Sequence, residues 1–399
     1  MAQLSYQIPD RGRPRRVLRV PESHTLYLCP NACGRRQGLR ALRNGVADHV
    51  SFLRFSQADV VLGDYLEQVE DAVATLLATV RPRPQVLSLY VNCIDDFLGT
   101  DGESLLAGLR TRFPETRFLL SHINPIAADV QSSTAQRIHA NLYTLLEPRA
   151  HKDAGVNLVG GFEPLAADCE LYDVLRGAQA GPIRQIVTSV SYGDYARMAS
   201  SMLTLSLSHL GDAAASDMES RLGIPSFRWP ASYDLDEIER RYEELALALR
   251  SNPVDCAGYR ARAEQVVAWA REAVGDLPIA VDSSSSMMPF SLALALRAYG
   301  FNVRAVFGLH LKGCDDEAEA RLMAECPEIM VVRRESYEAL CGYGMGERWV
   351  AVGSDAGFLL HARHLADLYH DEGCFGFHGV ERLMMELAAA VGRTQEWII

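Results

Sequence analysis

The sequence lacks several features that would assign it to a common class of protein. No apolar run reaches the roughly 18–20 residues that a membrane helix needs, and the first twenty residues hold no continuous apolar stretch before a small-residue cleavage site. We therefore expect a cytoplasmic protein. There is also no excess of basic charge, because 51 acidic residues outnumber 39 lysines and arginines and the formal net charge is −12. Since duplex binding rests on basic contacts to phosphate, this charge argues against a nucleic-acid partner.

Familiar catalytic motifs are missing too. There is no G-x-x-x-x-G-K-[ST] nucleotide loop and no G-x-S-x-G nucleophile elbow. The 11 histidines form no HxxxH or HxH pair, and His361 with His364 comes closest. Such pairs supply metal ligands from one helix or strand, so a mononuclear zinc enzyme is disfavoured.

Cysteine, by contrast, is plentiful, with nine residues. In the reducing cytosol thiols stay unpaired and can bind metals. Six of them lie singly in helical or loop segments, where we expect most to be structural: Cys169, Cys256, Cys314, Cys326, Cys341 and Cys374. Cys374 and His378 share the glycine-rich turn DEGCFGFHG, where packing is the ordinary role of either side chain and an approach to a ligand is the alternative.

From residue 25 onward, short apolar runs alternate with longer amphipathic stretches. This rhythm is typical of strand–helix units on a parallel sheet. It occurs in three blocks, so the predicted fold is α/β with three Rossmann-like, doubly wound parallel-sheet domains. The predicted divisions are an N-terminal arm over 1–24 and domains over 25–150, 151–276 and 277–399.

The stretch TLYLCPNACGRRQGLRALRNG, residues 25–45, places Cys29 and Cys33 where the first strand passes into the first helix. The dipole at a helix N-terminus favours a thiolate at Cys33. Cys93 follows the third strand, in LYVNCIDDFLGTDG. Because parallel strands end at one edge of a sheet, the three thiols form a candidate iron–sulfur site, with buried structural thiols as the competing interpretation. Asp95 and Asp96 can add a carboxylate ligand or a proton, although loop acids are usually solvated.

The stretch VDSSSSMMPF, residues 281–290, ends a strand and predicts a helix from Pro289, where proline is tolerated. Free N–H groups at that point can hold an anion. A helix capped by Ser286 or a neighbour explains the same residues equally well.

These blocks resemble the nitrogenase component 1 family, and the likeness is ordered along nearly the whole chain. CPNACGRRQGLRAL is similar to the family's Gly-Pro-x-x-Cys-Gly segment, with Cys33 at the cluster-ligating position. VNCIDDFLGTD resembles its second Cys motif, which continues into Gly-Asp-Asp. In that motif Cys93, Gly99 and Asp101 match the family, and Thr100 replaces the first Asp. Three further segments are similar to the family: ADVVLGDYLEQVEDAV, in which Asp59 and Gly63 match, DMESRLGIPSFRWP, and GFHGVERLMMELA.

Departures from the family pattern are equally informative. Family subunits that hold the P-cluster carry a further cysteine upstream of the Gly-Pro-x-x-Cys segment, whereas residues 1–28 of this chain contain none. Cys29 instead stands where the family has Gly, and it offers a third thiolate. Ala215 stands where the subunit with the iron–molybdenum cofactor has a cysteine, and the His-Ser-Trp motif is missing. The resemblance therefore implies neither an iron–molybdenum cofactor nor dinitrogen reduction.

By this resemblance, the chain is a compact nitrogenase-like oxidoreductase, similar in size to the components that reduce tetrapyrroles. It would hold a [4Fe–4S] cluster, accept electrons from an ATP-hydrolysing iron protein and reduce a bound substrate, tetrapyrrole-like or another small molecule. Cys29, Cys33 and Cys93 supply at most three ligands, so Asp95, Asp96, an exogenous molecule or a second subunit completes the set. We therefore expect a homodimer or a heterodimer with a related chain. The alternatives are a non-catalytic scaffold for cluster or cofactor assembly and a partner subunit that holds no cluster.

Overall fold

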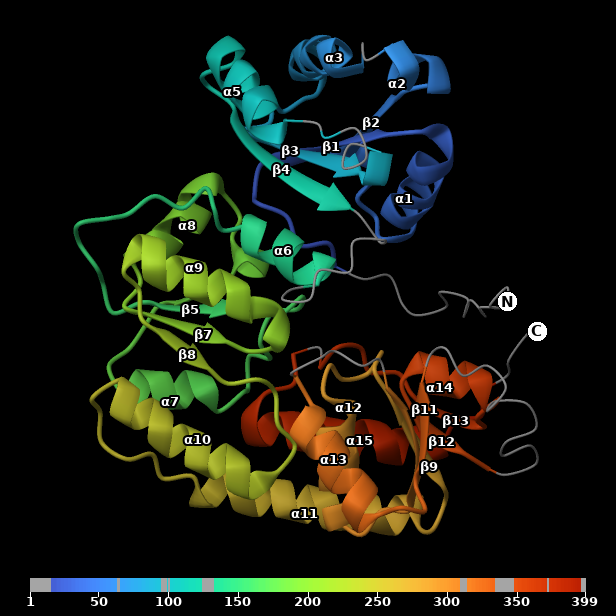
Figure 1. The fold of residues 1–399 in the computed structure, drawn as a ribbon. Coiled ribbons are helices and arrows are strands. Elements are labelled where there is room, and N and C mark those ends of the chain that lie inside the picture. The colour runs from blue at the N-terminus through green and yellow to red at the C-terminus, as the bar shows by residue number, and fades with distance from the viewer. Residues whose placement is uncertain are drawn as a thin grey trace. The chain divides into compact units, whose positions relative to one another are not determined.

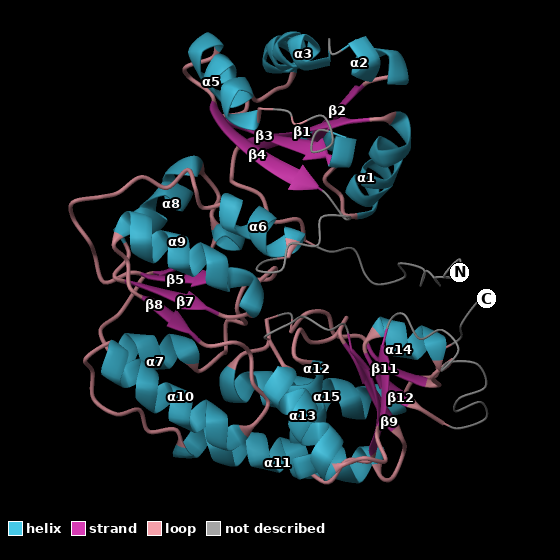
Figure 2. Cartoon of the chain, viewed as in Figure 1, coloured by secondary structure: helices cyan, strands magenta, loops and turns pink. Residues whose placement is uncertain are grey.

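The computed structural model describes residues 16–395 apart from 63–64, 95–98, 100, 124–132, 309–313, 334–347 and 372. In this part of the chain the strands form three sheets, each flanked by helices (Figures 1 and 2). Every strand pairing within the described ranges is parallel. The predicted α/β fold of three doubly wound sheets is confirmed.

Sheet A has the strand order β2-β1-β3-β4. Its strands alternate with helices along the chain: β1 (Ser23–Cys29), α1 (Asn31–Arg43), the 3-10 turn η1 (Ala47–His49), β2 (Val50–Arg54), α2 (Gln57–Leu62), α3 (Tyr65–Thr79), β3 (Val86–Asn92), α5 (Gly102–Arg112) and β4 (Arg117–Ile123). Apolar residues of α3 and α5, among them Val73 and Leu109, pack on Leu87 and Leu89 of β3. Helix α1 lies on the opposite face of the sheet (Figure 1).

Sheet B has the strand order β6-β5-β7-β8. Its elements are α6 (Thr134–Asn141), β5 (Val156–Val159), β6 (Ile183–Arg184), η2 (Ile186–Thr188), α8 (Tyr192–Ala196), η3 (Arg197–Ser200), β7 (Leu203–Ser206), η4 (His209–Gly211), α9 (Asp212–Leu222) and β8 (Ser226–Arg228). The two middle strands end close together: a Cβ on Gly160, just after β5, would lie 3.0 Å from the backbone nitrogen of Gly211. Only glycine permits that approach, because Gly160 has a φ of +89°.

Sheet C has the strand order β11-β10-β9-β12-β13. Its strands are β9 (Ile279–Asp282), β10 (Val303–Gly308), β11 (Met330–Arg333), β12 (Val350–Val352) and β13 (His364–Ala366). The accompanying helices are α7 (Leu171–Gly177), α10 (Leu235–Ala248), α11 (Ala257–Val274), α12 (Pro289–Ala298), α13 (Asp316–Glu325), α14 (Ser354–Leu359) and α15 (Gly376–Val391). The predicted helix does begin at Pro289.

The chain divides into two compact units. One holds sheets A and B, and the other holds sheet C together with α7, which comes from residues 165–180. Helix α7 therefore follows β5 in sequence but belongs to the sheet C unit. None of the helices described above has the length and apolar character needed to cross a bilayer.

Two long helices of the sheet C unit begin without a local cap. At α12 no capping side chain comes from Met288; the Asp315 carboxylate instead accepts the N–H groups of Phe290, at 2.7 Å, and Ser291, at 3.2 Å. Ser286 accepts from Met288 at 3.1 Å, one residue before the helix. The start of α12 therefore binds neither an external anion nor Ser286, which were the two interpretations that the sequence left open.

The start of α15 is capped in the same way, over a longer separation. Glu170, just before α7, is almost fully buried and accepts the N–H groups of Phe377, at 2.6 Å, and His378, at 3.1 Å. The Tyr242 hydroxyl donates to the same carboxylate at 2.8 Å. A Cβ on Gly376 would overlap this carboxylate. The backbone of Gly376, with a φ of +58°, also favours glycine.

Candidate functional site

The carboxyl edge of sheet A collects the cysteines that the sequence singled out. Cys29 is the last residue of β1, Cys33 lies in the first turn of α1, and Cys93 directly follows β3. Strands β1 and β3 are neighbours, with Tyr27 opposite Tyr90. The structure therefore brings the ends of both strands, and the thiols that follow them, to one edge of one sheet.

Cys29 lies beneath helix α1. It is 4% exposed, and a Cβ on Gly34 would lie 3.1 Å from its sulfur. The same Cβ would lie 3.4 Å from the ring of Phe52 on β2, and a Cβ on Gly38 would lie 3.6 Å from it. The two glycines thus let α1 pack closely on the sheet, and the thiol of Cys29 faces that packed layer.

Cys33 is exposed, unlike Cys29. It lies in the first turn of α1, where the N-cap Pro30 offers no capping side chain and no acidic residue is present. The free N–H groups of a helix N-terminus carry partial positive charge, which favours an anionic sulfur. Cys33 is therefore accessible and lies at an uncapped helix N-terminus.

Cys93 is partly exposed, and its position is fixed by the residue before it. The side-chain amide of Asn92 donates to the carbonyl of Leu28 on β1 at 2.8 Å, and its oxygen accepts the N–H of Ile94 at 2.9 Å. Asn92 thus ties the turn that carries Cys93 to the end of β1. Asn92 was not among the residues predicted from the sequence, although an asparagine at the end of an apolar strand is the signal that could have identified it.

The loop after Cys93 is described only in part. Asp95, Asp96 and Thr100 lie outside the described residues, so their expected roles stay predictions. Asp101 caps α5 by accepting the N–H of Ser104 at 3.1 Å, and hydrogen bonds from Ser104 lower the pKa of Asp101. Within the described ranges, no group of three or more His, Cys, Asp or Glu side chains is arranged to hold a metal ion.

A row of aromatic rings lies one layer below the cysteine edge. Tyr27 stacks on Phe52, with ring centroids 5.4 Å apart, and lies 5.2 Å from Tyr90. The rings come from three adjacent strands. Burial raises the pKa of Tyr27, so its phenol stays neutral near pH 7. The row gives the edge of the sheet a rigid, apolar floor.

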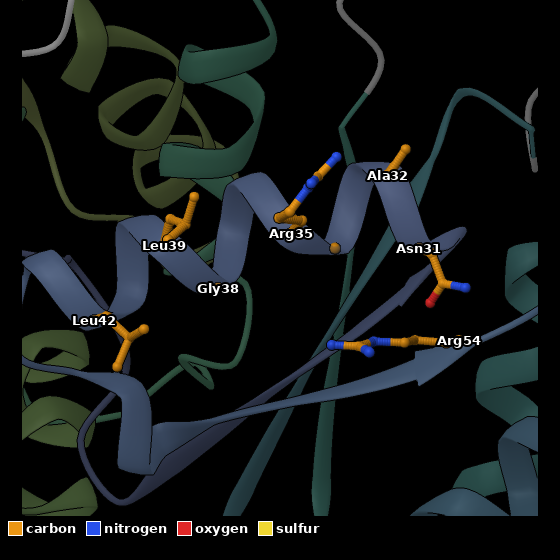
Figure 3. A pocket seen from close by; sticks show the side chains of 8 residues that line it. Asn31, Ala32, Arg35, Gly38, Leu39, Leu42 and Arg54 are labelled. Atoms are coloured by element: carbon orange, nitrogen blue, oxygen red, sulfur yellow. The ribbon is translucent and has the colours of Figure 1, made fainter.

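An open groove of about 730 Å³ runs along α1 beside the cysteine edge. It is lined by Asn31, Ala32, Gly34, Arg35, Gly38, Leu39 and Leu42 of α1 and by Arg54 of β2. Figure 3 shows the Arg54 side chain extending beneath the first turn of α1. None of the described residues that line this groove is acidic, and Arg35 and Arg54 give this lining a positive charge.

The other candidates that lie within the described residues form no second site. Cys169, Cys256, Cys326 and Cys374 are buried, as expected for structural thiols, and Cys341 lies outside the described residues. Burial raises the pKa of Cys256 to about 12. His378 is 8% exposed and its Nε2 lies 3.2 Å from Asp168, so it is a packed histidine.

His361 and His364 do not share a site. His364 on β13 is buried, and its Nδ1 lies 2.9 Å from the carbonyl of Arg393, whereas His361 is exposed in the preceding turn. Ala215 is fully buried in the core around α9. The cysteine edge of sheet A therefore has two accessible thiols, and the groove along α1 lies beside it.

Comparison with known proteins agrees with this arrangement. The model of the family "Nitrogenase component 1 type Oxidoreductase" matches residues 16–392. Two similar solved structures are described as nitrogenase Cp1 at pH 6.5 and at pH 5, with TM-scores of 0.72 and 0.66 and identities of 13% and 14%. The first covers 98% of this chain and 95% of its own, and the second 98% and 91%. No curated protein matches the sequence. At these identities the solved structures show the shared fold alone.

Proposed function

The chain belongs to the nitrogenase component 1 type oxidoreductases, and from this premise we propose that it holds an iron–sulfur cluster of the [4Fe–4S] type at the carboxyl edge of sheet A. When bound, such a cluster supplies low-potential one-electron transfer. The proposed electron donor is a separate ATP-hydrolysing iron protein, and the proposed acceptor is a bound small-molecule substrate.

One observation carries the proposal: the two cysteines at the family's motif positions, Cys33 and Cys93, are both accessible, and each follows one of two adjacent strands, β1 and β3, within a few residues. Their surroundings fit thiolate ligands, since Cys33 lies at an uncapped helix N-terminus beside arginines. Cys29 fits less well, because its sulfur lies beneath Gly34 and would need the first turn of α1 to move.

Each residue has a separate part in the proposed site. Cys33 and Cys93 would bind iron, and Asn92 would keep the two strand ends in register through its bond to Leu28. The aromatic row of Tyr27, Phe52 and Tyr90 would exclude water from the floor of the site. Since one chain supplies at most three thiols here, we propose that a second subunit or a loop acid completes the ligand set.

The direct test is the metal content of the full chain. Protein purified without oxygen, or reconstituted with iron and sulfide, should contain iron and acid-labile sulfide in equal amounts. Cys33→Ala and Cys93→Ala should each lose this iron. Cys314→Ala, which removes a partly exposed thiol from the sheet C unit, and Cys326→Ala, which removes a buried one, should keep it. Iron retained in all four variants would place the cluster elsewhere.

A scaffold that holds a cluster for delivery is the second candidate, and it is favoured by the small number of accessible thiols at this edge. A cluster with few protein ligands is released more easily than one with four. Electron transfer with an iron protein and ATP distinguishes the two functions. A catalytic component is re-oxidised by substrate over many turnovers, whereas a scaffold passes its iron to an acceptor protein once.

A further inference from the structure

Two carboxylates hold the loop that follows β9. Residues 283–287, here called the serine loop, connect β9 to α12 at the carboxyl edge of sheet C. The Oδ1 atom of Asp282, which is fully buried, accepts the N–H groups of Ser284, at 2.7 Å, and Ser285, at 3.1 Å. It also accepts the Ser284 hydroxyl at 2.6 Å. The start of the serine loop is therefore bound to the last residue of β9.

The end of the serine loop is bound to a residue much further along the chain. The Oδ2 atom of Asp371, which is partly buried, accepts the Ser286 hydroxyl and the Met287 N–H, each at 3.2 Å. In return, the N–H of Asp371 donates to the carbonyl of Ser285 at 2.8 Å. His370 and Asp371 have φ values of +44° and +59°, which residues other than glycine rarely adopt. The contact with the serine loop therefore holds these two residues in a strained backbone conformation.

The surroundings of both carboxyl groups favour the neutral acid. Burial raises the pKa of Asp282 to about 7, and repulsion by Asp355 adds to this effect. Burial also raises the pKa of Asp371 to about 6, with repulsion by Asp315 in addition. A further ionisable group in contact with Asp371 is Tyr233, whose hydroxyl donates to Oδ1 at 2.8 Å. Each carboxyl group therefore keeps its proton at a pH where an exposed aspartate is charged.

Neighbouring hydroxyl groups let the loop accommodate these protons. A hydroxyl group can either donate or accept, so it can turn towards or away from a carboxyl group. The Ser284 Oγ lies 2.6 Å from Asp282 and 3.4 Å from the Ser354 Oγ, so it can accept from the first and donate to the second. The Tyr233 hydroxyl lies beside the other carboxyl group and the Cys374 thiol, and it can turn in the same way. Loss of the protons instead leaves negative charges that face other acids.

We propose that the serine loop is a pH-sensitive switch, which is closed while Asp282 and Asp371 carry their protons and opens when they lose them. Opening brings both carboxylates into water and relieves the strained backbone at His370. A carboxyl group with a raised pKa stabilises the closed loop at low pH, and this stability is lost as the pH rises through the raised pKa. Since ligands bind at the carboxyl edge of such sheets, the switch changes the shape of a surface suited to binding.

The switch goes beyond the proposed function and does not depend on it. All of its residues lie in the sheet C unit, whereas Cys33 and Cys93 lie in the other unit. A protein without a cluster should therefore show the same opening, and a protein whose serine loop does not open can still bind iron.

Hydrogen exchange of the full chain, measured by mass spectrometry on peptides covering residues 283–288, tests the switch. After correction for intrinsic exchange rates, protection should fall at least about tenfold from pH 5 to pH 8. This is the shift expected if the pKa of Asp371 alone drops from about 6 to 3.8 on opening. In Asp371→Asn and in Asp282→Asn the fall should be smaller by about tenfold or more, because an amide keeps an acceptor but does not titrate. Either variant is sufficient if the other does not fold.

Asp276→Asn is the matched control, because it removes an acid whose side chain is 93% exposed in the same unit. That variant should follow the wild type. At pH 8, peptides covering β10 should stay better protected than the serine loop, since only the loop opens.

Three results would overturn the proposal. The first is protection of the serine loop that does not fall between pH 5 and pH 8 in the wild type. The second is a fall of the wild-type size in the folded Asn variants of Asp371 and Asp282, or a fall reduced just as much in Asp276→Asn. The third is equal protection of the serine loop and β10 at pH 8, which would show that the unit unfolds as a whole.

Discussion

Replacing His139 by glutamine should remove most of the loss of local stability that sheet B undergoes around β5 when the pH falls from 7 to 5. His139 on α6 is 3% exposed, and its Nε2 accepts the N–H of Gly160 at 3.0 Å. Burial lowers the pKa of His139 from 6.5 to about 4, because the charged imidazolium would lose its hydration. The neutral ring is therefore the form that the folded protein requires. Glutamine keeps an acceptor for Gly160 but does not titrate in this range.

The size of the effect follows from linkage. A group whose folded pKa is lowered contributes stability above its unfolded pKa, and this stability is lost as the pH falls towards the folded value. At about 1.4 kcal/mol per pKa unit, the full effect of His139 is about 3 kcal/mol. Between pH 7 and pH 5, the loss expected from this one residue is about 2 kcal/mol.

Hydrogen exchange measured by mass spectrometry on peptides covering β5 reports this local stability. After correction for intrinsic exchange rates, wild-type protection should fall by about 2 kcal/mol from pH 7 to pH 5, and in His139→Gln it should fall much less. His151→Gln, at an exposed position in the preceding loop, is the control and should follow the wild type. An equal fall in wild type and His139→Gln would refute the argument from burial.

Three further outcomes are expected. Gly376→Ala should lower the free energy of unfolding of the sheet C unit by about 2–4 kcal/mol, because the added Cβ would overlap a buried carboxylate and the φ of Gly376 is positive. The control is Gly258→Ala, in open space on α11, which should change this free energy by less than about 1 kcal/mol. Thermal melts compare the two variants. Burial, and then repulsion by Asp355, raises the pKa of Asp282 to about 7. The stability that this carboxyl contributes is present below its ordinary pKa of 3.8 and is lost as the pH rises through 7. The melting temperature of the wild type should therefore fall between pH 5 and pH 8, and that of Asp282→Asn should fall by less. Elemental analysis should find no stoichiometric molybdenum, because Ala215 stands where the family's cofactor-binding cysteine lies; a molar equivalent of molybdenum would contradict this.

The sequence predicted the class of fold because its signals are local. Alternating strands and amphipathic helices fix the parallel sheets, and the helix that begins at Pro289 follows from the fixed φ of proline. The same local patterns placed Cys33 at the start of a helix and Cys93 at the end of a strand. Parallel pairing then brings those ends to one edge, so the location of the candidate site also followed from the sequence.

Accessibility within that site required the structure. Cys29 and Cys33 lie four residues apart, yet one is buried and the other exposed. Cys29 is buried because α1 packs over the end of β1, where a Cβ on Gly34 would lie 3.1 Å from its sulfur. The groove beside the site likewise depends on Arg54 meeting a helix that precedes it in sequence.

The caps of two helices show most clearly which features are local in the sequence and which depend on the tertiary structure. The sequence by itself determined where α12 begins, because the φ of Pro289 is fixed locally. It missed the start of α15, since DEGCFGFHG was interpreted as a turn, whereas the helix already begins at Gly376 and includes His378. It did not determine what satisfies their free N–H groups: Asp315 lies 25 residues from Phe290, and Glu170 lies 207 residues from Phe377. These carboxylates reach the helix ends because packing of the sheets and helices brings distant loops close to them. That proximity exists only once the tertiary structure has formed.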